Sequence, residues 1–110
     1  MQYEFKTEFF KALAHPLRIQ VLDELRAGPL NVSELRGRLG VEQSTLSQQL
    51  AVLRNRGLVR TQRNGSTIRY EVADPAIWSL LDAALAIFQN QLVSVRSVLE
   101  DLRPGLTSAT

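Results

Sequence analysis

The chain has 110 residues, which is enough for one compact domain and too few for two. It contains no cysteine, so a disulfide framework and thiolate chemistry are excluded. Residues 1–18 lack the uninterrupted apolar core of a signal peptide, and no uncharged apolar run is long enough to span a membrane. We therefore expect a soluble, cytoplasmic protein with no membrane partner.

The net charge of +2 is unevenly distributed along the chain. Residues 16–70 hold nine arginines and four acidic residues, a net of +5, whereas residues 71–110 hold two arginines and five acidic residues, a net of −3. Every cation of the middle segment is arginine, which suits bidentate contact with phosphate and guanine. The pattern favours a nucleic-acid partner. The alternative is a solvated surface with a small net positive charge, which would have the same composition.

The first half of the chain is predicted to form three helices. Residues 3–14 carry apolar side chains at helical spacing, and a proline separates them from a second helix over residues 16–27. Asn31 and Glu34 have the spacing of a capping box, in which each side chain accepts a hydrogen bond from the other residue's backbone N–H. A short third helix follows and ends at Gly40.

A fourth helix is predicted over about residues 42–57, and only a tight turn separates it from the third. Two short β-type runs follow, residues 58–63 and 66–72, and Asn64 and Gly65 join them with the strongest short signal for a hairpin. The third and fourth helices thus have the form of a helix-turn-helix, which presents its second helix outward.

The fourth helix has two contrasting faces. Leu46, Leu50 and Leu53 recur at spacings of four and three, which predicts a buried stripe. The opposite face carries short hydroxyls and amides, which can hydrogen-bond base edges in the major groove where long charged side chains would hold the helix away. The candidate base-reading residues are Gln43, Ser44, Ser47 and Gln48. The alternative is a polar surface helix with no such role.

The predicted hairpin is rich in arginine. A basic two-stranded ribbon beside a recognition helix can lie along the DNA backbone or reach a minor groove. The candidate backbone contacts are Thr45 in the fourth helix and Arg60, Arg63, Asn64 and Arg69 in the hairpin. Arg63 and Asn64 are the first choices, whereas Arg69 fits an ordinary cross-strand partner almost equally well.

The last helix is predicted from Asp74 and Pro75 to about residue 102, and it carries a heptad pattern. Its apolar positions are Trp78, Leu81, Leu85, Phe88, Leu92, Val95, Leu99 and Leu102. Packing against the first two helices would use part of this seam, but a seam of this length exceeds what one small subunit covers. We therefore expect a two-fold dimer interface, shared with Phe5 and Phe9 of the first helix.

Together these elements predict a mainly α fold with a β-hairpin wing, which is a winged helix-turn-helix. Residues 1–103 are expected to form a single domain that binds DNA and dimerises through the N- and C-terminal helices. Residues 104–110 are expected to form a flexible tail.

The motifs as a set resemble the ArsR/SmtB family of bacterial winged-helix repressors over about residues 5–100. The matching segments are residues 13–18 (LAHPLR), 32–35 (VSEL), 43–54 (QSTLSQQLAVLR), 57–59 (GLV) and the wing from Arg63 to Tyr70. The resemblance implies a homodimer whose recognition helices enter successive major grooves, about 34–36 Å apart. It also implies base reading by the same four positions of the fourth helix. Two residues depart from the family: Glu42 replaces a frequent serine cap, and Ser66 replaces a frequent wing arginine, which puts one phosphate contact in question.

No cofactor and no metal site are expected. Metal sensors of the family often place cysteines on the third helix, where this chain has Asn31, Ser33 and Glu34, or histidines and carboxylates on the last helix, which here has no histidine. Transition metals prefer thiolate and imidazole ligands, and His15 is the only imidazole. The expected input is a small apolar molecule, a partner protein or the protein's own abundance.

The function predicted from these observations is a homodimeric repressor that binds an inverted-repeat operator in double-stranded DNA and associates with the bacterial nucleoid when bound. The first rival is a winged-helix module for protein–protein interaction, which would not need an uncharged polar face beside a basic wing. The second rival is a small enzyme. It is disfavoured because the one histidine precedes a proline at a helix junction and no serine has a plausible base.

Overall fold

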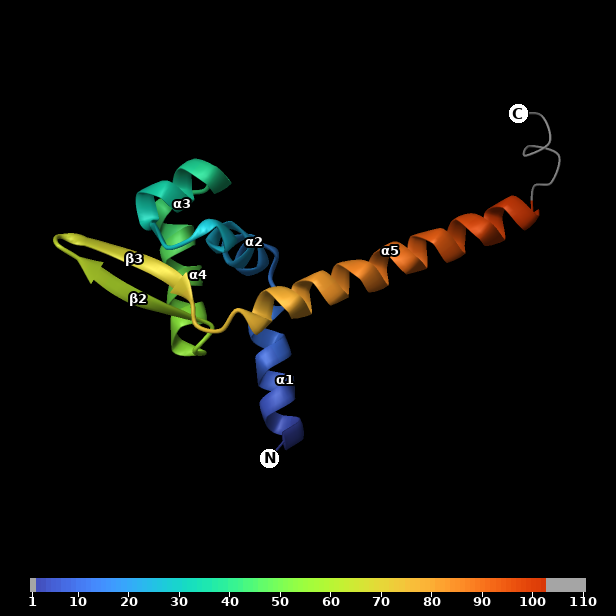
Figure 1. The fold of residues 1–110 in the computed structure, drawn as a ribbon, viewed down its shortest axis with the longest axis horizontal. Helices are drawn as coiled ribbons and strands as arrows, with labels where there is room; N and C mark the ends of the chain where they lie inside the picture. The colour runs from blue at the N-terminus through green and yellow to red at the C-terminus, as the bar shows by residue number, and fades with distance from the viewer. Residues whose placement is uncertain (1, 103–110) are drawn as a thin grey trace. The chain divides into compact units, whose positions relative to one another are not determined.

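The computed structural model describes residues 2–102, and the chain divides into two units, Met1–Trp78 and Ser79–Thr110. The elements are α1 (Gln2–Leu13), α2 (Pro16–Glu24), a 3-10 turn (Leu25–Ala27), β1 (Leu30–Asn31), α3 (Val32–Leu39), α4 (Gln43–Asn55), β2 (Val59–Asn64), β3 (Thr67–Val72) and α5 (Ala76–Leu102) (Figure 1). The tail predicted over residues 104–110 lies outside the described residues. The mainly helical fold with a hairpin wing is confirmed.

The core of the first unit is built mainly from leucine. Its fully buried side chains are Val21, Leu22, Leu25, Leu35, Leu46, Leu50 and Leu53, contributed by α2, the 3-10 turn, α3 and α4. Among the described residues no polar or charged residue is buried. The helix-turn-helix is thus held by apolar packing, which leaves its polar residues at the surface.

The helix starts follow local chemistry. Asn31 Oδ1 accepts a hydrogen bond from the Glu34 N–H at 2.8 Å, and Glu34 Oε1 accepts one from the Asn31 N–H at 3.0 Å, so the predicted capping box is confirmed. His15 Nδ1 accepts a hydrogen bond from the Leu17 N–H at 3.2 Å and caps α2. The second helix is shorter than predicted, because a 3-10 turn replaces its last residues.

The sheet has three antiparallel strands in the order β1-β3-β2, so the predicted hairpin gains a short strand that sequence reasoning did not predict. The predicted hairpin turn at Asn64 and Gly65 is one residue too early, since Asn64 pairs with Thr67 and the turn residues are Gly65 and Ser66. Gly65 has a φ of 67°, a left-handed value that favours glycine at the first central position of a two-residue turn.

The start of α5 belongs to the first unit. Asp74 Oδ1 accepts a hydrogen bond from the Ala76 N–H at 2.9 Å, so Asp74 caps the helix as predicted, although the helix begins at Ala76 rather than at Pro75. The Trp78 indole N–H donates to the Leu22 carbonyl at 2.8 Å. This contact ties the start of α5 to the last turn of α2.

Beyond Trp78, α5 forms the second unit by itself. A single helix has no core of its own, so the prediction of one domain over residues 1–103 stays a prediction. The helix is long and apolar enough, with a mean hydropathy of 1.3, to meet the length and composition of a membrane span. A helix with one long apolar seam meets the same criterion, so this property alone does not identify a membrane span.

Candidate nucleic-acid interface

The two faces of α4 lie as the sequence predicts. Leu46, Leu50 and Leu53 are at most 1% exposed, so the apolar stripe is fully covered within the chain. The residues predicted to contact DNA from this helix are all exposed: Gln43, Ser44, Thr45, Ser47 and Gln48. Their exposure makes a hydrogen-bonding surface of hydroxyls and amides.

The joint between α3 and α4 is set by backbone geometry. Gly40 ends α3 with a φ of 64°, and its N–H donates to the Arg36 carbonyl at 2.8 Å. This left-handed position favours glycine and turns the chain tightly into the next helix. Glu42 stands at the N-cap of α4 but its side chain makes no capping hydrogen bond. The first-turn N–H groups of α4 therefore have no side-chain cap from Glu42.

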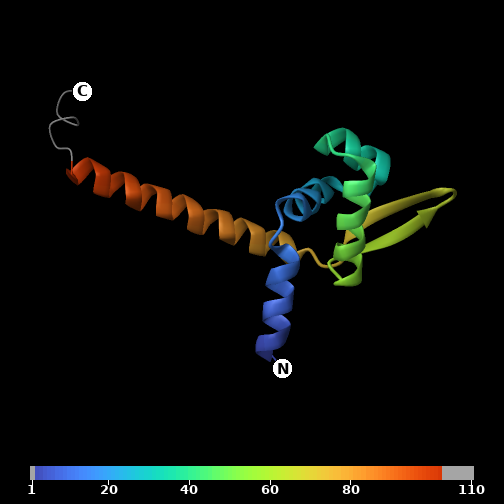
Figure 2. The same ribbon diagram turned by 180° about the vertical axis from the view of Figure 1, so that it is seen from behind.

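A groove of about 430 Å³ lies between the start of α3, the start of α4 and the wing tip. It is lined by Asn31, Val32, Ser33, Arg36, Gln43, Ser66, Thr67 and Ile68. Within it Arg36 Nη1 donates a long hydrogen bond of 3.5 Å to Gln43 Oε1. Gln43, a predicted base-reading residue, thus lines the same groove as the wing tip, and the backbones of α4 and the hairpin lie side by side (Figure 2).

The wing residues divide between two faces of the hairpin. Directly paired residues share a face, and successive residues alternate. Arg60, Asn64 and Arg69 lie on one face, because Arg60 pairs with Glu71 and Arg69 pairs with Gln62. Arg63 lies on the other face. It pairs with Ile68. The groove beside α4 is lined from both faces of the hairpin, since Thr67, the partner of Asn64, lines it together with Ile68.

Two of the wing arginines, Arg60 and Arg69, lie opposite other side chains of the sheet and are not simply free cations on a ribbon. Arg60 Nε donates to Glu71 Oε1 at 2.6 Å, and this hydrogen bond is the largest cause that lowers the pKa of Glu71 below its ordinary value. Arg69 stands opposite Gln62 and, on its other side, opposite Asn31 in β1. Arg63 is exposed near the tip, and the described residues form no ion pair with it.

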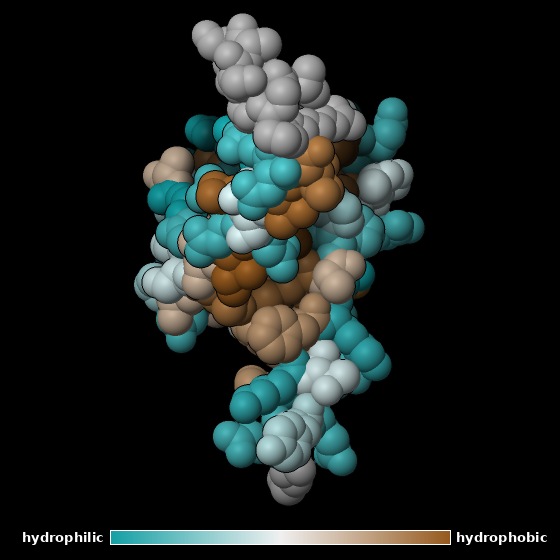
Figure 3. Space-filling model, turned by 90° about the vertical axis from the view of Figure 1, so that its right-hand side faces the viewer, coloured by the Kyte–Doolittle hydropathy of each residue, from teal (hydrophilic) through white to brown (hydrophobic). Residues whose placement is uncertain are grey.

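The residues predicted to form a dimer interface differ in exposure. In α1, Phe5 is 71% exposed and Phe9 is half-buried, with their rings stacked at a centroid distance of 6.2 Å. In α5, Trp78 and Leu81 are half-buried. The rest of the seam is 50–56% exposed: Leu85, Phe88, Leu92, Val95 and Leu99. Figure 3 shows such apolar side chains, in brown, at the molecular surface.

Two residues that sequence reasoning left out bear on the interface. Arg18 Nε donates to Gln49 Oε1 at 2.8 Å, and Arg18 Nη1 donates to the carbonyls of Lys11 and Ala12 at 3.4 and 3.2 Å. No periodic pattern signals this contact, since Arg18 and Gln49 are 31 residues apart.

Across residues 2–102, histidine, cysteine, aspartate and glutamate form no group of three that could hold a metal ion.

A helix-turn-helix whose second helix exposes hydroxyls and amides beside a β-hairpin defines a winged helix-turn-helix DNA-binding protein. The family model described as "Bacterial regulatory protein, arsR family" matches residues 15–61. The HTH-type transcriptional regulator Rv0081 of Mycobacterium tuberculosis, named as uncharacterized, is 45% identical over 104 residues, which are 94% of this chain and 91% of the relative. The chain belongs to the ArsR family of bacterial transcription regulators and is a DNA-binding regulator.

Further relatives are transcription regulators or have the same winged helix-turn-helix fold. The crystal structure of Rv0081 has a TM-score of 0.77 at 42% identity and covers 84% of this chain and 94% of that chain. The biofilm growth-associated repressor of Agrobacterium fabrum is 44% identical over 78 residues, which are 71% of this chain and 67% of the relative. The NMR structure of the homodimeric winged helix-turn-helix domain of Mb0332 from Mycobacterium bovis has a TM-score of 0.74 at 27% identity, covering 83% of this chain and 84% of that chain. Proteins of this family are regulators and not enzymes.

Proposed function

We propose that the chain is a homodimeric transcriptional repressor that binds an inverted-repeat operator and blocks a promoter. The observation that carries the proposal is the exposed face of α4, where five hydroxyl and amide side chains stand without a charged residue among them. Gln43, Ser44, Ser47 and Gln48 read base edges in the major groove, because amides and hydroxyls match the donor and acceptor pattern there. Thr45 contacts the backbone at the edge of the helix.

The wing supplies backbone contacts of unequal strength. Arg63 is the main contact, because it is exposed near the tip and forms no ion pair among the described residues. Asn64 assists from the hairpin end. Arg60 and Arg69 contribute less, since they share the opposite face and the guanidinium of Arg60 already pairs with Glu71. The phosphate backbone provides most of the affinity, whereas base contacts provide the choice of site.

Dimerisation supplies the spacing of the two reading helices. The seam of α5 exposes five large apolar side chains along one helix, and Phe5 of α1 is exposed as well. A contiguous exposed apolar face such as that of α5 marks an interaction surface. A two-fold dimer matches an inverted repeat and sets the half-sites about 34–36 Å apart. The Mycobacterium bovis relative is described as homodimeric, which supports the same assembly here.

The experiment is footprinting of the DNA upstream of the gene with purified protein, followed by gel shifts on the protected site and on a scrambled sequence of equal length. We expect one protected inverted repeat and binding at least about a thousandfold tighter than to the scrambled sequence. Equal affinity for both sequences would remove base reading from the proposal. The absence of any DNA binding would favour the rival role as a protein–protein interaction module.

The site of action is the cytoplasm, where the regulators of this family bind DNA, and the protein joins the nucleoid when bound. It acts without a catalytic step and without a cofactor. Release from DNA responds to a small apolar molecule, a partner protein or the protein's own concentration. Repression rather than activation follows if the protected site overlaps the promoter, and the name of the Agrobacterium fabrum relative supports repression.

A further inference from the structure

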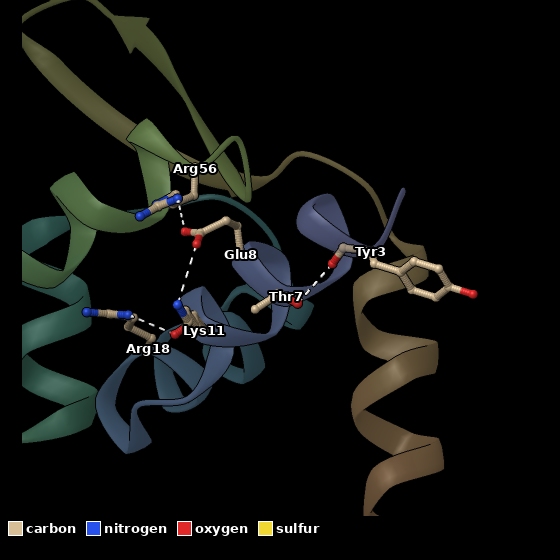
Figure 4. A network of polar contacts seen from close by, with 6 residues as sticks. All are labelled: Tyr3, Thr7, Glu8, Lys11, Arg18 and Arg56. Carbon is tan, nitrogen blue, oxygen red and sulfur yellow. Dashed lines mark hydrogen bonds and ion pairs between the residues drawn. The ribbon is translucent and has the colours of Figure 1, made fainter. Parts of the chain in front are cut away.

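The first helix is joined to the rest of its unit by little apolar burial. Only Ala12 and Leu13, at its C-terminal end, are buried, and most of its other side chains are exposed. Because so little of this helix is buried, its orientation depends mainly on contacts other than apolar packing. Polar side chains link this helix to its neighbours: Arg18 of α2 reaches its last turn, and Glu8 pairs with Arg56 of α4 (Figure 4). Arg18 also donates to Gln49 of α4.

The stronger set is centred on Arg18. Its Nη1 donates to the carbonyls of Lys11 and Ala12 in the last turn of α1, and the Lys11 carbonyl also accepts the Ala14 N–H at 3.2 Å. Its Nε donates to Gln49 Oε1 at 2.8 Å, and both side chains are half-buried. One rigid guanidinium therefore holds the end of α1 and the middle of α4 at the same time.

The second set joins the ends of the same two helices. Arg56 at the C-cap of α4 donates to Glu8 Oε2 at 2.9 Å, and Lys11 lies 3.6 Å from the other oxygen of Glu8. These side chains are about half or more exposed, so water and salt weaken the pair. Arg18 is thus the main fastening, and the pair of Glu8 with Arg56 is a weaker second one.

The hydrogen bond between Arg18 and Gln49 lies next to the proposed base-reading residues of α4. Gln49 directly follows Gln48, one of the proposed base-reading residues, and lies between the buried Leu46 and Leu53 in the sequence. The apolar stripe packs α4 on the core, and the hydrogen bond from Arg18 adds a contact whose energy depends on distance and angle. Such a directional contact favours one rotation of α4 about its axis.

We propose that Arg18 is a positioning residue for the recognition helix, which fixes α4 to α1 through Gln49 so that the two helices move as one body. The inference rests on the proposed reading of DNA by α4. Because α1 carries part of the proposed dimer interface, the partner subunit then orients the reading helix through Arg18. Removing the fastening lowers discrimination between operator and random DNA more than it lowers stability.

Variants at Gln49 and Arg18 separate the effect of the hydrogen bond from the effects of side-chain size and charge. Gln49→Met removes the acceptor at nearly constant shape, whereas Gln49→Glu keeps an acceptor for Arg18. Arg18→Lys keeps the charge but loses the planar fork that serves two partners. Gln20→Met is the matched control, because Gln20 is an exposed glutamine of the neighbouring α2.

The first measurement is the ratio of operator affinity to random-DNA affinity, which cancels the general effect of an added charge. Gln49→Met and Arg18→Lys should lower the ratio about tenfold, the order expected for a hydrogen bond to a charged group. In Gln49→Glu and Gln20→Met, the ratio should stay within about twofold of the wild-type ratio, which is the usual scatter of such measurements. An unchanged ratio in Gln49→Met would overturn the proposal.

The second measurement needs no DNA. The chain has no cysteine, so Glu4→Cys with Arg54→Cys gives one spin label on α1 and one on α4, in chains diluted with unlabelled protein. The distance distribution should broaden in Gln49→Met and Arg18→Lys, and should stay narrow in Gln49→Glu and Gln20→Met. An unchanged width in Gln49→Met would show that Arg18 does not fix α4, even if the protein should prove not to read DNA. A broadened distribution without any operator preference in the wild type would instead count against the proposed function alone.

Discussion

The helices α4 and α5 carry apolar residues at the same spacing but cover them to very different degrees. Leu50 in α4 is 1% exposed, whereas Leu92 in α5 is 52% exposed and Phe88 is 54% exposed. The stripe of α4 meets α2 and α3 within its own unit, while the seam of α5 has no such cover among residues of its unit. Helical spacing therefore predicts that a face is apolar, but it does not predict which surface covers that face.

The opposite faces of the two helices differ as well. The exposed face of α4 holds hydroxyls and amides with no lysine or glutamate, and α5 carries the charges Asp82, Arg96 and Glu100 between its apolar positions. Charged residues are what a solvated helix surface normally presents. The comparison thus supports our proposal that the polar face of α4 meets DNA and that the apolar face of α5 meets a protein partner.

The largest expected effect is on assembly. Phe88→Glu places a carboxylate in the middle of the proposed dimer seam, where burial of an unpaired charge is strongly unfavourable. We expect sedimentation to show a dimer for the wild type and a monomer for the variant, with the helical content retained in the first unit. Ser94→Glu, on the same helix but outside the heptad positions, is the control and should remain dimeric. A monomeric wild type at micromolar concentration would contradict the idea.

The next effect separates the two apolar faces directly. Leu50→Ala leaves a cavity in a closed core, and the free energy of unfolding should fall by about 2–5 kcal/mol at every protein concentration. Leu92→Ala should lower stability in a way that depends on concentration, because it weakens association rather than the packing of one chain. Chemical denaturation at two protein concentrations measures both. Equal, concentration-independent losses would mean that the α5 seam is covered within its own chain.

The features that sequence reasoning predicted correctly depend on residues close together in the chain. The capping box joins residues three apart, and the buried stripe of α4 follows from a spacing of three and four. The hairpin was also predicted, but its turn is one residue later than expected, because the register that pairs Asn64 with Thr67 decides which residues turn. Neighbouring residues restrict φ and ψ locally, so such signals are strong without knowledge of the fold.

The features that were missed depend on distant partners. β1 has only two residues, and Leu30 is a strand residue because the edge of β3 pairs with it. The contacts of Arg18 with Gln49 and of Trp78 with Leu22 span 31 and 56 residues. No periodicity reports which long side chain bridges two helices. The sequence therefore predicts the exposed polar face of α4 and the hairpin, but not the long-range contacts made by Arg18 and Trp78.

A smaller effect tests the polar face of α4. Gln48→Ala should weaken operator binding by about 1–3 kcal/mol per lost base contact and should leave binding to random DNA unchanged. Ser44→Ala should act in the same direction, since its hydroxyl lies on the same exposed face. Fluorescence anisotropy on both DNA sequences provides the measurement. Equal losses on operator and random DNA would show that these side chains position the protein without reading bases.

The wing should show a smaller and sequence-independent effect. Arg63→Ala should weaken binding to every DNA sequence and reduce the slope of log affinity against log salt by about one unit per contact, or two in a dimer. Arg60→Ala removes the same charge from the opposite face, where the side chain already pairs with Glu71, and should change the slope less. A larger change for Arg60 than for Arg63 would reverse the assignment of the two wing faces.

The smallest expected effect is the response of the α5 region to metals and oxidants, for which we expect no release from the operator. Zinc, cobalt, nickel and cadmium prefer thiolate and imidazole ligands, and the chain has one histidine and no cysteine. That histidine is already engaged, because its Nδ1 accepts the Leu17 N–H at the start of α2. Arsenite and peroxide act on thiols, and Met1 is the only sulfur. Gel shifts with each agent at micromolar concentration measure the response. Specific release by any one of them, without aggregation, would direct attention to His15 and to the carboxylates Asp82, Glu100 and Asp101 of α5.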